Sequence, residues 1–100
     1  MSAMSALIAK LQKARSVVCI SPIRCVDGLE LSIQAGRHHY SLWSEDGSVP
    51  EKVEIGYPSE QVAEILPFAE DPANPTETVY KYVPLQLVAQ IIAAHGGIEE

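Results

Sequence analysis

The chain has 100 residues, of which 47% are apolar and 20% are charged, and 13 acidic against 7 basic residues give a net charge of −6. This apolar content argues against a disordered chain, and the lack of any run of about 18 apolar residues argues against a membrane-spanning helix. In the N-terminal segment the charges follow the apolar residues, which is the reverse of a secretory signal. We therefore expect one cytoplasmic domain over residues 1–100, with no membrane association.

The N-terminal segment has the apolar spacing of an amphipathic helix. Its apolar stripe consists of Met4, Leu7, Ile8 and Leu11. Ser2 or Ser5 can cap the first turn, and Lys13 suits the C-terminal end, where the helix dipole favours a positive charge. The apolar run 17–20 then predicts a central strand buried on both faces, which Pro22 ends.

A hairpin is expected next, because Asp27 and Gly28 form a strong turn signal between segments 23–26 and 29–34. In the second segment, an apolar set alternates with a polar set: Leu29, Leu31 and Ile33 against Glu30, Ser32 and Gln34. This period of two predicts a strand with one face in the core and the other in solvent.

Two further strands continue an antiparallel meander. The first is predicted over residues 38–43, and a turn at 44–47 separates it from the second, over residues 52–57. Val53, Ile55 and Tyr57 alternate along the second strand, so we expect all three to point toward the same side.

After the meander, Ser59 is positioned to cap a short helix that Pro67 ends, and residues 68–78 have the composition of an irregular acidic loop. The segment 79–83 alternates as a strand, with Tyr80 and Tyr82 expected on one face.

The last element is a helix that begins at or next to Pro84, since proline is well suited to a first helical position. Its apolar stripe is Leu87, Val88, Ile91 and Ile92. His95 and Gly96 are expected to end it, because a last-turn cation and a C-terminal glycine both favour termination.

Together these elements predict an α+β fold: a mostly antiparallel sheet of four to five strands with the N- and C-terminal helices packed on one face. One hydrophobic cluster is expected to contain Leu31, Ile33, Val53, Ile55, Val88, Ile91 and Ile92.

Residue types that could support catalysis or metal binding are present without a recognisable pattern. Cys19 and Cys25 match no redox or zinc spacing and are expected to be buried free thiols. His38 and His39 are adjacent in a predicted strand, so their side chains point to opposite faces and cannot easily share a metal ion. Cys25, Asp27 and His38 could act together only if the fold assembled them. We therefore predict no catalytic residue, no metal and no cofactor, and classify the chain as a non-enzyme.

Charge suggests a different kind of function. Residues 1–40 have a net charge of +3 and residues 41–100 a net charge of −9. Such a surface disfavours nucleic acid and attracts a basic protein partner, although the acids could also serve solubility alone. The candidate interaction residues are Trp43, Glu45, Asp46, Glu60, Glu64, Glu70 and Asp71. Trp43 is either an interface anchor or the cover of a core edge formed by Tyr40 and Leu42.

Three segments, "LSIQAGRHHYSL", "VEIGYPSE" and "TVYKYVPLQLVAQIIAAHGG", resemble a group of small accessory proteins encoded by bacteriophages and prophages. The likeness covers residues 29–98 and leaves out the first helix. It implies a phage accessory product that binds a host protein, as small acidic inhibitors of host defence such as anti-CRISPR proteins do. It implies no catalytic residue.

Three functions therefore remain open. The first is binding of a host protein through the acidic surface. The second is a small self-associating structural protein, such as a homodimer that uses a sheet edge or the last helix. The third is a small-molecule binder or enzyme in which His38, His39 and Tyr40 line a pocket.

Overall fold

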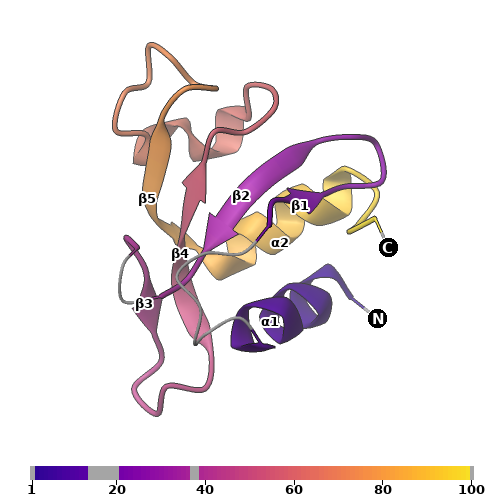
Figure 1. Ribbon diagram of the computed structural model, residues 1–100, viewed down its shortest axis with the longest axis vertical. Coiled ribbons are helices and arrows are strands. Elements are labelled where there is room, and N and C mark those ends of the chain that lie inside the picture. The colour runs from indigo at the N-terminus through magenta and orange to yellow at the C-terminus, as the bar shows by residue number, and fades with distance from the viewer. Residues whose placement is uncertain (1, 14–20, 37–38, 100) are drawn as a thin grey trace.

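Figure 1 shows the computed structural model of the chain, which describes residues 2–13, 21–36 and 39–99. Within these ranges the chain forms two α-helices, five strands and one short 3-10 helix. In order, they are α1 (Ala3–Lys13), β1 (Ile23–Arg24), β2 (Glu30–Gln34), β3 (Leu42–Trp43), β4 (Pro50–Gly56), η1 (Ala63–Phe68), β5 (Val79–Pro84) and α2 (Leu85–Ala94). The predicted strand 17–20 lies outside the described residues.

Strand β4 is the centre of the sheet. Its C-terminal half pairs with β2, its N-terminal half pairs with β3, and β5 also pairs with it, while β1 extends the sheet beyond β2. All of these pairings are antiparallel. Ile33 lies opposite Ile55 between β2 and β4, and Val53 lies opposite Val83 between β4 and β5. Apolar side chains are thereby aligned across the three central strands.

Both helices pack on one face of this sheet, where α1 contacts α2 and β4, and α2 contacts β4 and β5 (Figure 1). All seven side chains predicted for the core belong to a single cluster, and none is more than 1% exposed. Leu7 and Leu11 of α1 join the same cluster. The predicted α+β fold, with an antiparallel sheet and terminal helices on one face, is confirmed.

The signals at the helix ends act as predicted. In α1, the Ser2 hydroxyl oxygen accepts a hydrogen bond from the Ser5 N–H at 3.1 Å. Helix α2 begins directly after Pro84. At its other end Gly96 has a φ of 91°, and the Gly97 N–H donates to the Ile92 carbonyl at 2.9 Å, which is the bond that closes a left-handed helix terminus.

The β1–β2 hairpin also follows its sequence signal. The Leu29 N–H donates to Asp27 Oδ1 at 3.2 Å, and Gly28 supplies a φ of 103° that other residues rarely adopt. On the outer side of β1, the Val26 N–H donates to the Gly97 carbonyl at 2.9 Å. The C-terminal residues thus cover this edge of the sheet, as the yellow end of the chain beside β1 shows in Figure 1.

Strand β3 is shorter than predicted, because the segment before it leaves the sheet plane. The Tyr40 N–H donates to the Glu54 carboxylate, and the Tyr40 carbonyl accepts from the Tyr82 N–H, so residues 39–41 lie over β4 and beside β5. Gln34 is only 6% exposed, so its predicted placement in solvent was wrong. Residue 38, the start of the predicted strand, lies outside the described residues.

The predicted alternation of β5 is also wrong. Val83 lies opposite Val53, but Tyr80 lies opposite Ile55, so two residues of β5 face one residue of β4. This β-bulge places Tyr82 at a φ of 53° and turns its side chain away from the core. Tyr80 is completely buried, whereas Tyr82 is 47% exposed.

Two predictions at the end of β4 are wrong. Tyr57 does not continue the alternation of Val53 and Ile55, because its φ of 46° turns the chain and leaves its side chain 64% exposed. Ser59 does not cap a helix: its N–H donates to the Glu30 carbonyl at 3.0 Å, and its hydroxyl accepts from the Glu30 N–H at 2.9 Å. The element that follows is a 3-10 helix, η1, with Pro67 inside it.

Candidate functional site

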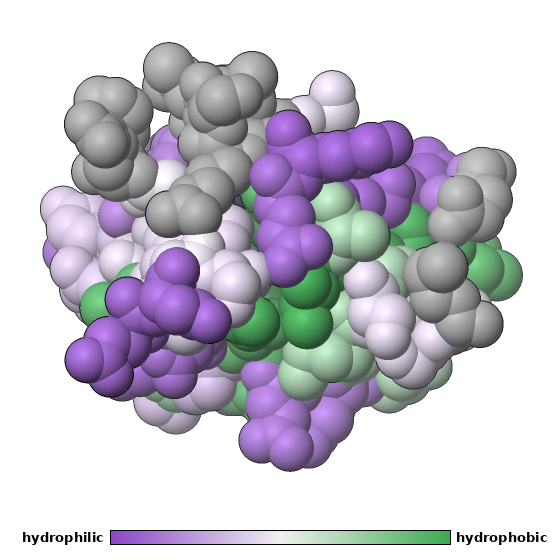
Figure 2. All heavy atoms as spheres, turned by 90° about the horizontal axis from the view of Figure 1, so that it is seen from below, coloured by the Kyte–Doolittle hydropathy of each residue, from purple (hydrophilic) through white to green (hydrophobic). Residues whose placement is uncertain are grey.

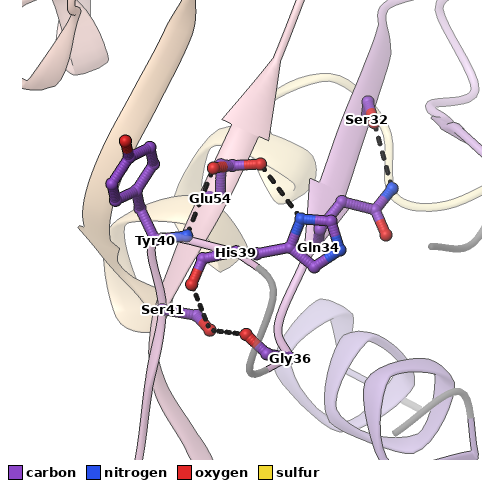
Figure 3. Close-up of polar contacts among 7 residues, drawn as sticks. All are labelled: Ser32, Gln34, Gly36, His39, Tyr40, Ser41 and Glu54. Carbon is purple, nitrogen blue, oxygen red and sulfur yellow. Dashed lines mark hydrogen bonds and ion pairs between the residues drawn. The ribbon is translucent and has the colours of Figure 1, made fainter. Parts of the chain in front are cut away.

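The face of the sheet opposite the helices, called here the outer face, contains a partly buried carboxylate. Val53 and Ile55 point into the core, so Glu54 between them points to the outer face. Its Oε1 lies 3.2 Å from His39 Nδ1, and its Oε2 accepts a hydrogen bond from the Tyr40 N–H at 3.2 Å (Figure 3). The side chains of Glu54 and His39 are each only 15% exposed. This carboxylate therefore fixes His39 and Tyr40 on the sheet.

One result of this arrangement is an exposed pair of aromatic rings, Tyr40 and Tyr82, called here the aromatic pair. Their centroids are 6.0 Å apart with an interplanar angle of 67°, which is the favoured edge-to-face geometry. The Lys81 Nζ lies 4.4 Å from the Tyr40 ring centroid and 3.7 Å from the Glu70 carboxylate. Lys81 thus links the aromatic pair to an acidic residue that follows η1.

The acidic residues predicted as one surface lie in two places. Glu45 and Asp46 are in the β3–β4 turn, at the bottom of Figure 1, whereas the others lie within or next to η1 at the top. We call the second group the acidic end; it consists of Glu60, Glu64, Glu70 and Asp71. The molecule is 35 Å long in this direction. One patch on a partner protein can therefore contact the acidic end more readily than it can contact all of these residues together.

At the opposite end the hydrophilic surface is interrupted. Figure 2 shows the molecule from below, with hydrophobic side chains gathered in the middle of the face and hydrophilic groups divided around them. The acidic β3–β4 turn lies at this end of the molecule. Its charges are thus separated from the acidic end by the length of the fold.

Two of the predicted acids hold turns together. Asp46 Oδ1 accepts hydrogen bonds from the Ser44 hydroxyl at 2.7 Å, the Ser48 N–H at 3.0 Å and the Ser48 hydroxyl at 2.7 Å. These donors, those of Ser48 first, lower the pKa of Asp46 to about 2. Asp71 Oδ2 accepts from the Asn74 amide at 2.8 Å. Glu45, Glu60 and Glu64 are exposed and make no such contact within the described part of the chain.

Trp43 is a structural residue more than an exposed anchor. Its indole N–H donates to the Ala35 carbonyl at 3.0 Å, and its side chain is partly buried. This agrees with the alternative in which Trp43 covers an edge. However, Tyr40 and Leu42, which were expected to face the core beneath it, are 43% and 50% exposed on the outer face.

The structure places His95 beside Asp27. His38, which the sequence analysis considered with Cys25 and Asp27, lies outside the described residues, as does Cys19. His95 Nδ1 lies 2.6 Å from Asp27 Oδ2. The Leu29 N–H, and after it His95, lower the pKa of Asp27. Cys25 is fully buried, and burial followed by the nearby Asp27 charge raises the pKa of its thiol. The thiol is therefore kept protonated and inaccessible, which is unsuited to a nucleophile.

Most of the cationic side chains in the described ranges gather elsewhere. A cleft of about 350 Å³ between α1, β1 and the C-terminal residues is lined by Lys10, Lys13, Ser21, Pro22, Ile23, Arg24, Ile98 and Glu99. Arg24 pairs with Glu99 at 3.5 Å. The positive part of the surface thus lies apart from the acidic end.

Sequence reasoning missed Glu54 and Tyr82. Glu54 alternates with Val53 and Ile55 and therefore looks like an ordinary solvent-facing strand residue, with no signal that a loop covers it. Tyr82 became exposed because of a bulge, and the regular alternation of its segment gave no sign of the extra residue.

No three His, Cys, Asp or Glu side chains within the described ranges are placed to share a metal ion. Among the described helices, none combines the length and apolar content needed to cross a bilayer. Comparison with family models, curated proteins and solved structures finds no match to this chain. The resemblance to phage-encoded accessory proteins therefore stays a prediction.

Proposed function

We propose that the chain is a non-enzymatic accessory protein that binds another protein through the acidic end and the adjoining aromatic pair. The observation that carries this proposal is the position of Lys81, which contacts both the Glu70 carboxylate and the Tyr40 ring. Because of this link, the acidic end and the aromatic pair form one continuous surface. Under the resemblance to phage products, the partner is a cytoplasmic host protein, and host-defence factors are the first class to test.

The two parts of this surface have complementary chemistry. Glu60 and Glu64 are exposed carboxylates that can attract a basic partner over a distance. Tyr40 and Tyr82 offer rigid, partly apolar rings, and tyrosine is common among the residues that dominate binding energy. The expected partner surface is an apolar patch bordered by lysine and arginine.

The acid–base groups in the described ranges support binding better than catalysis, because the fold already uses them. The His39–Glu54 pair fixes residues 39–41, and the His95–Asp27 pair joins the β1–β2 turn to the end of α2. Cys25, two residues before Asp27, is buried.

Affinity capture from a bacterial lysate tests the proposal with three forms of the full chain. The wild type is compared with a variant that carries Glu60→Lys and Glu64→Lys, and with a Glu45→Lys control at the other end of the molecule. We expect the wild type and the control to retain the same protein, which the double variant loses. Equal capture by all three forms would exclude the acidic end, and equal loss from both variants would indicate an effect of net charge alone.

Self-association is tested on the same samples by light scattering after gel filtration. A stable homodimer that the double variant disrupts would favour the alternative of a self-associating structural protein over a host partner.

A further inference from the structure

A third exposed tyrosine, Tyr57, stands on the outer face. Tyr57 adopts a left-handed backbone conformation, with a φ of 46°, that glycine or asparagine would adopt at lower energy. Its backbone N–H donates to the Thr78 carbonyl at 3.0 Å, so the conformation is fixed by the fold. Its side chain is nevertheless 64% exposed. Strained residues of this kind are concentrated at binding sites.

Tyr57 borders a cleft of about 350 Å³ that is lined by Pro22, Glu30, Ser32, Tyr57 and Ser59. Its walls are held in place by hydrogen bonds between Glu30 and Ser59, at 3.0 Å and 2.9 Å, which join the end of β4 to β2. The Ser32 hydroxyl also accepts a bond from the Gln34 side chain at 3.0 Å. The cleft is therefore largely preformed.

The chemistry of the lining favours a cation. Glu30 has no ion-pair partner among the described residues, since its cross-strand neighbour Arg24 pairs with Glu99 instead. The tyrosine ring can face a positive charge, and the carboxylate can accept two parallel N–H bonds from a planar guanidinium. An anion would be repelled by Glu30, and one carboxylate is too few for a metal site.

We propose that this cleft receives an arginine side chain of the partner protein, with Glu30 pairing the guanidinium and the Tyr57 ring packing against it. The proposal rests on the proposed function, because it specifies one contact with the basic partner. Position supports it: Ser59 in the cleft is followed directly by Glu60 of the acidic end. One arginine can thus enter the cleft while neighbouring basic residues face the acidic end.

A titration followed by backbone amide NMR tests this contact without knowledge of the partner. The probe is N-acetyl-arginine N-methylamide, and the citrulline and lysine analogues at equal ionic strength are the controls. We expect saturable shifts at Glu30, Tyr57 and Ser59 with the arginine probe, no binding of the uncharged citrulline analogue, and weaker binding of lysine, which lacks the planar fork.

Variants decide which groups hold the probe. Glu30→Gln and Tyr57→Leu should each weaken arginine binding about tenfold, since each removes one charge-dependent contact, while Tyr82→Leu should leave it unchanged. Amide spectra that match the wild type elsewhere confirm that the variants fold. Equal binding of the citrulline or lysine analogue, or an unaffected Glu30→Gln variant, would overturn the assignment. Partner capture that still depends on Glu60 and Glu64 would then leave the proposed function standing.

Discussion

At the scale of single residues, the exposed Asp46 and Asp71 differ from Glu60 and Glu64 in side-chain length. Asp46 and Asp71 are short enough to accept hydrogen bonds from their own turns, as aspartate commonly does. Glu60 and Glu64 reach further from the backbone and make no polar contact within the described part of the chain. The aspartates are thus engaged in the fold, and the glutamates remain available to a partner.

Asp46 gives the stability of the protein a defined dependence on pH. Its pKa in the folded state is about 2, below the ordinary 3.8, so its stabilising contribution is present above about pH 4 and is lost as pH falls through 2. The melting temperature of Asp46→Asn should therefore be lower than that of the wild type between about pH 5 and about pH 7. The difference should shrink as the pH falls toward about 2. A difference that is constant with pH would show that the turn does not depend on the charge.

Replacement of Tyr57 by glycine should stabilise the protein, which is unusual for a glycine substitution. Because a left-handed residue is strained by about 1–2 kcal/mol and glycine returns part of this as chain entropy, Tyr57→Gly should raise the free energy of unfolding by about 0.5–1 kcal/mol. Chemical denaturation measures this change in the free energy of unfolding.

Tyr80→Ala is the contrasting variant. Tyr80 is fully buried and its hydroxyl donates to the Pro75 carbonyl, so Tyr80→Ala should lower the free energy of unfolding by about 3–5 kcal/mol. A comparable loss at Tyr57 would show that its ring stabilises the fold.

At the scale of elements, local signals were sufficient where the contacts are local. The caps of α1 and α2 and the Asp27–Gly28 turn involve residues within a few positions of each other, so sequence predicted them correctly. The position of residues 39–41 depends on the contacts of Tyr40 with Glu54 and Tyr82, which are distant from it in sequence. No local pattern encodes such contacts, and the candidate site built from them could not be predicted.

Helix α2 should be sensitive to truncation on one side only. Ile91 is 1% exposed in the core, so Ile91→Ala should lower the free energy of unfolding by about 2–5 kcal/mol through lost burial and a new cavity. Gln90→Ala, on the exposed side of the same turn, should change it by less than about 0.5 kcal/mol. Urea denaturation of both variants checks the contrast, and a small loss at Ile91 would mean that this side of the helix is not buried.

Residues 39–41 should loosen when the Glu54 carboxylate is removed. Glu54→Ala leaves the Tyr40 N–H and the His39 ring without their acceptor, so the free energy of unfolding should fall by about 1–3 kcal/mol. Hydrogen exchange at the Tyr40 amide should also accelerate more than exchange in β2. Glu54→Gln keeps one acceptor oxygen and should lose less. Unchanged exchange at Tyr40 would assign the position of residues 39–41 to other contacts.

At the scale of the whole molecule, charge is separated in space as well as in sequence. Lys10, Lys13 and Arg24 line the cleft between α1 and β1, while the acidic end lies within or next to η1. A basic partner approaching this dipolar molecule is drawn toward η1 and repelled from the first helix. If the proposed binding occurs, this distribution would orient the encounter with the partner.

Association with the partner should consequently depend on salt. Electrostatic steering acts over a Debye length of about 10 Å at 0.1 M salt, so the association rate should fall as salt rises, and Glu64→Lys should slow association while Glu45→Lys should not. Tyr82→Ala removes a ring of the aromatic pair and should mainly speed dissociation, since short-range contacts govern that rate. Surface plasmon resonance with the captured partner separates the two rates. If association does not depend on salt and Glu64→Lys associates at the wild-type rate, the acidic end serves solubility alone. The interface would then lie at α1 or at the sheet edge.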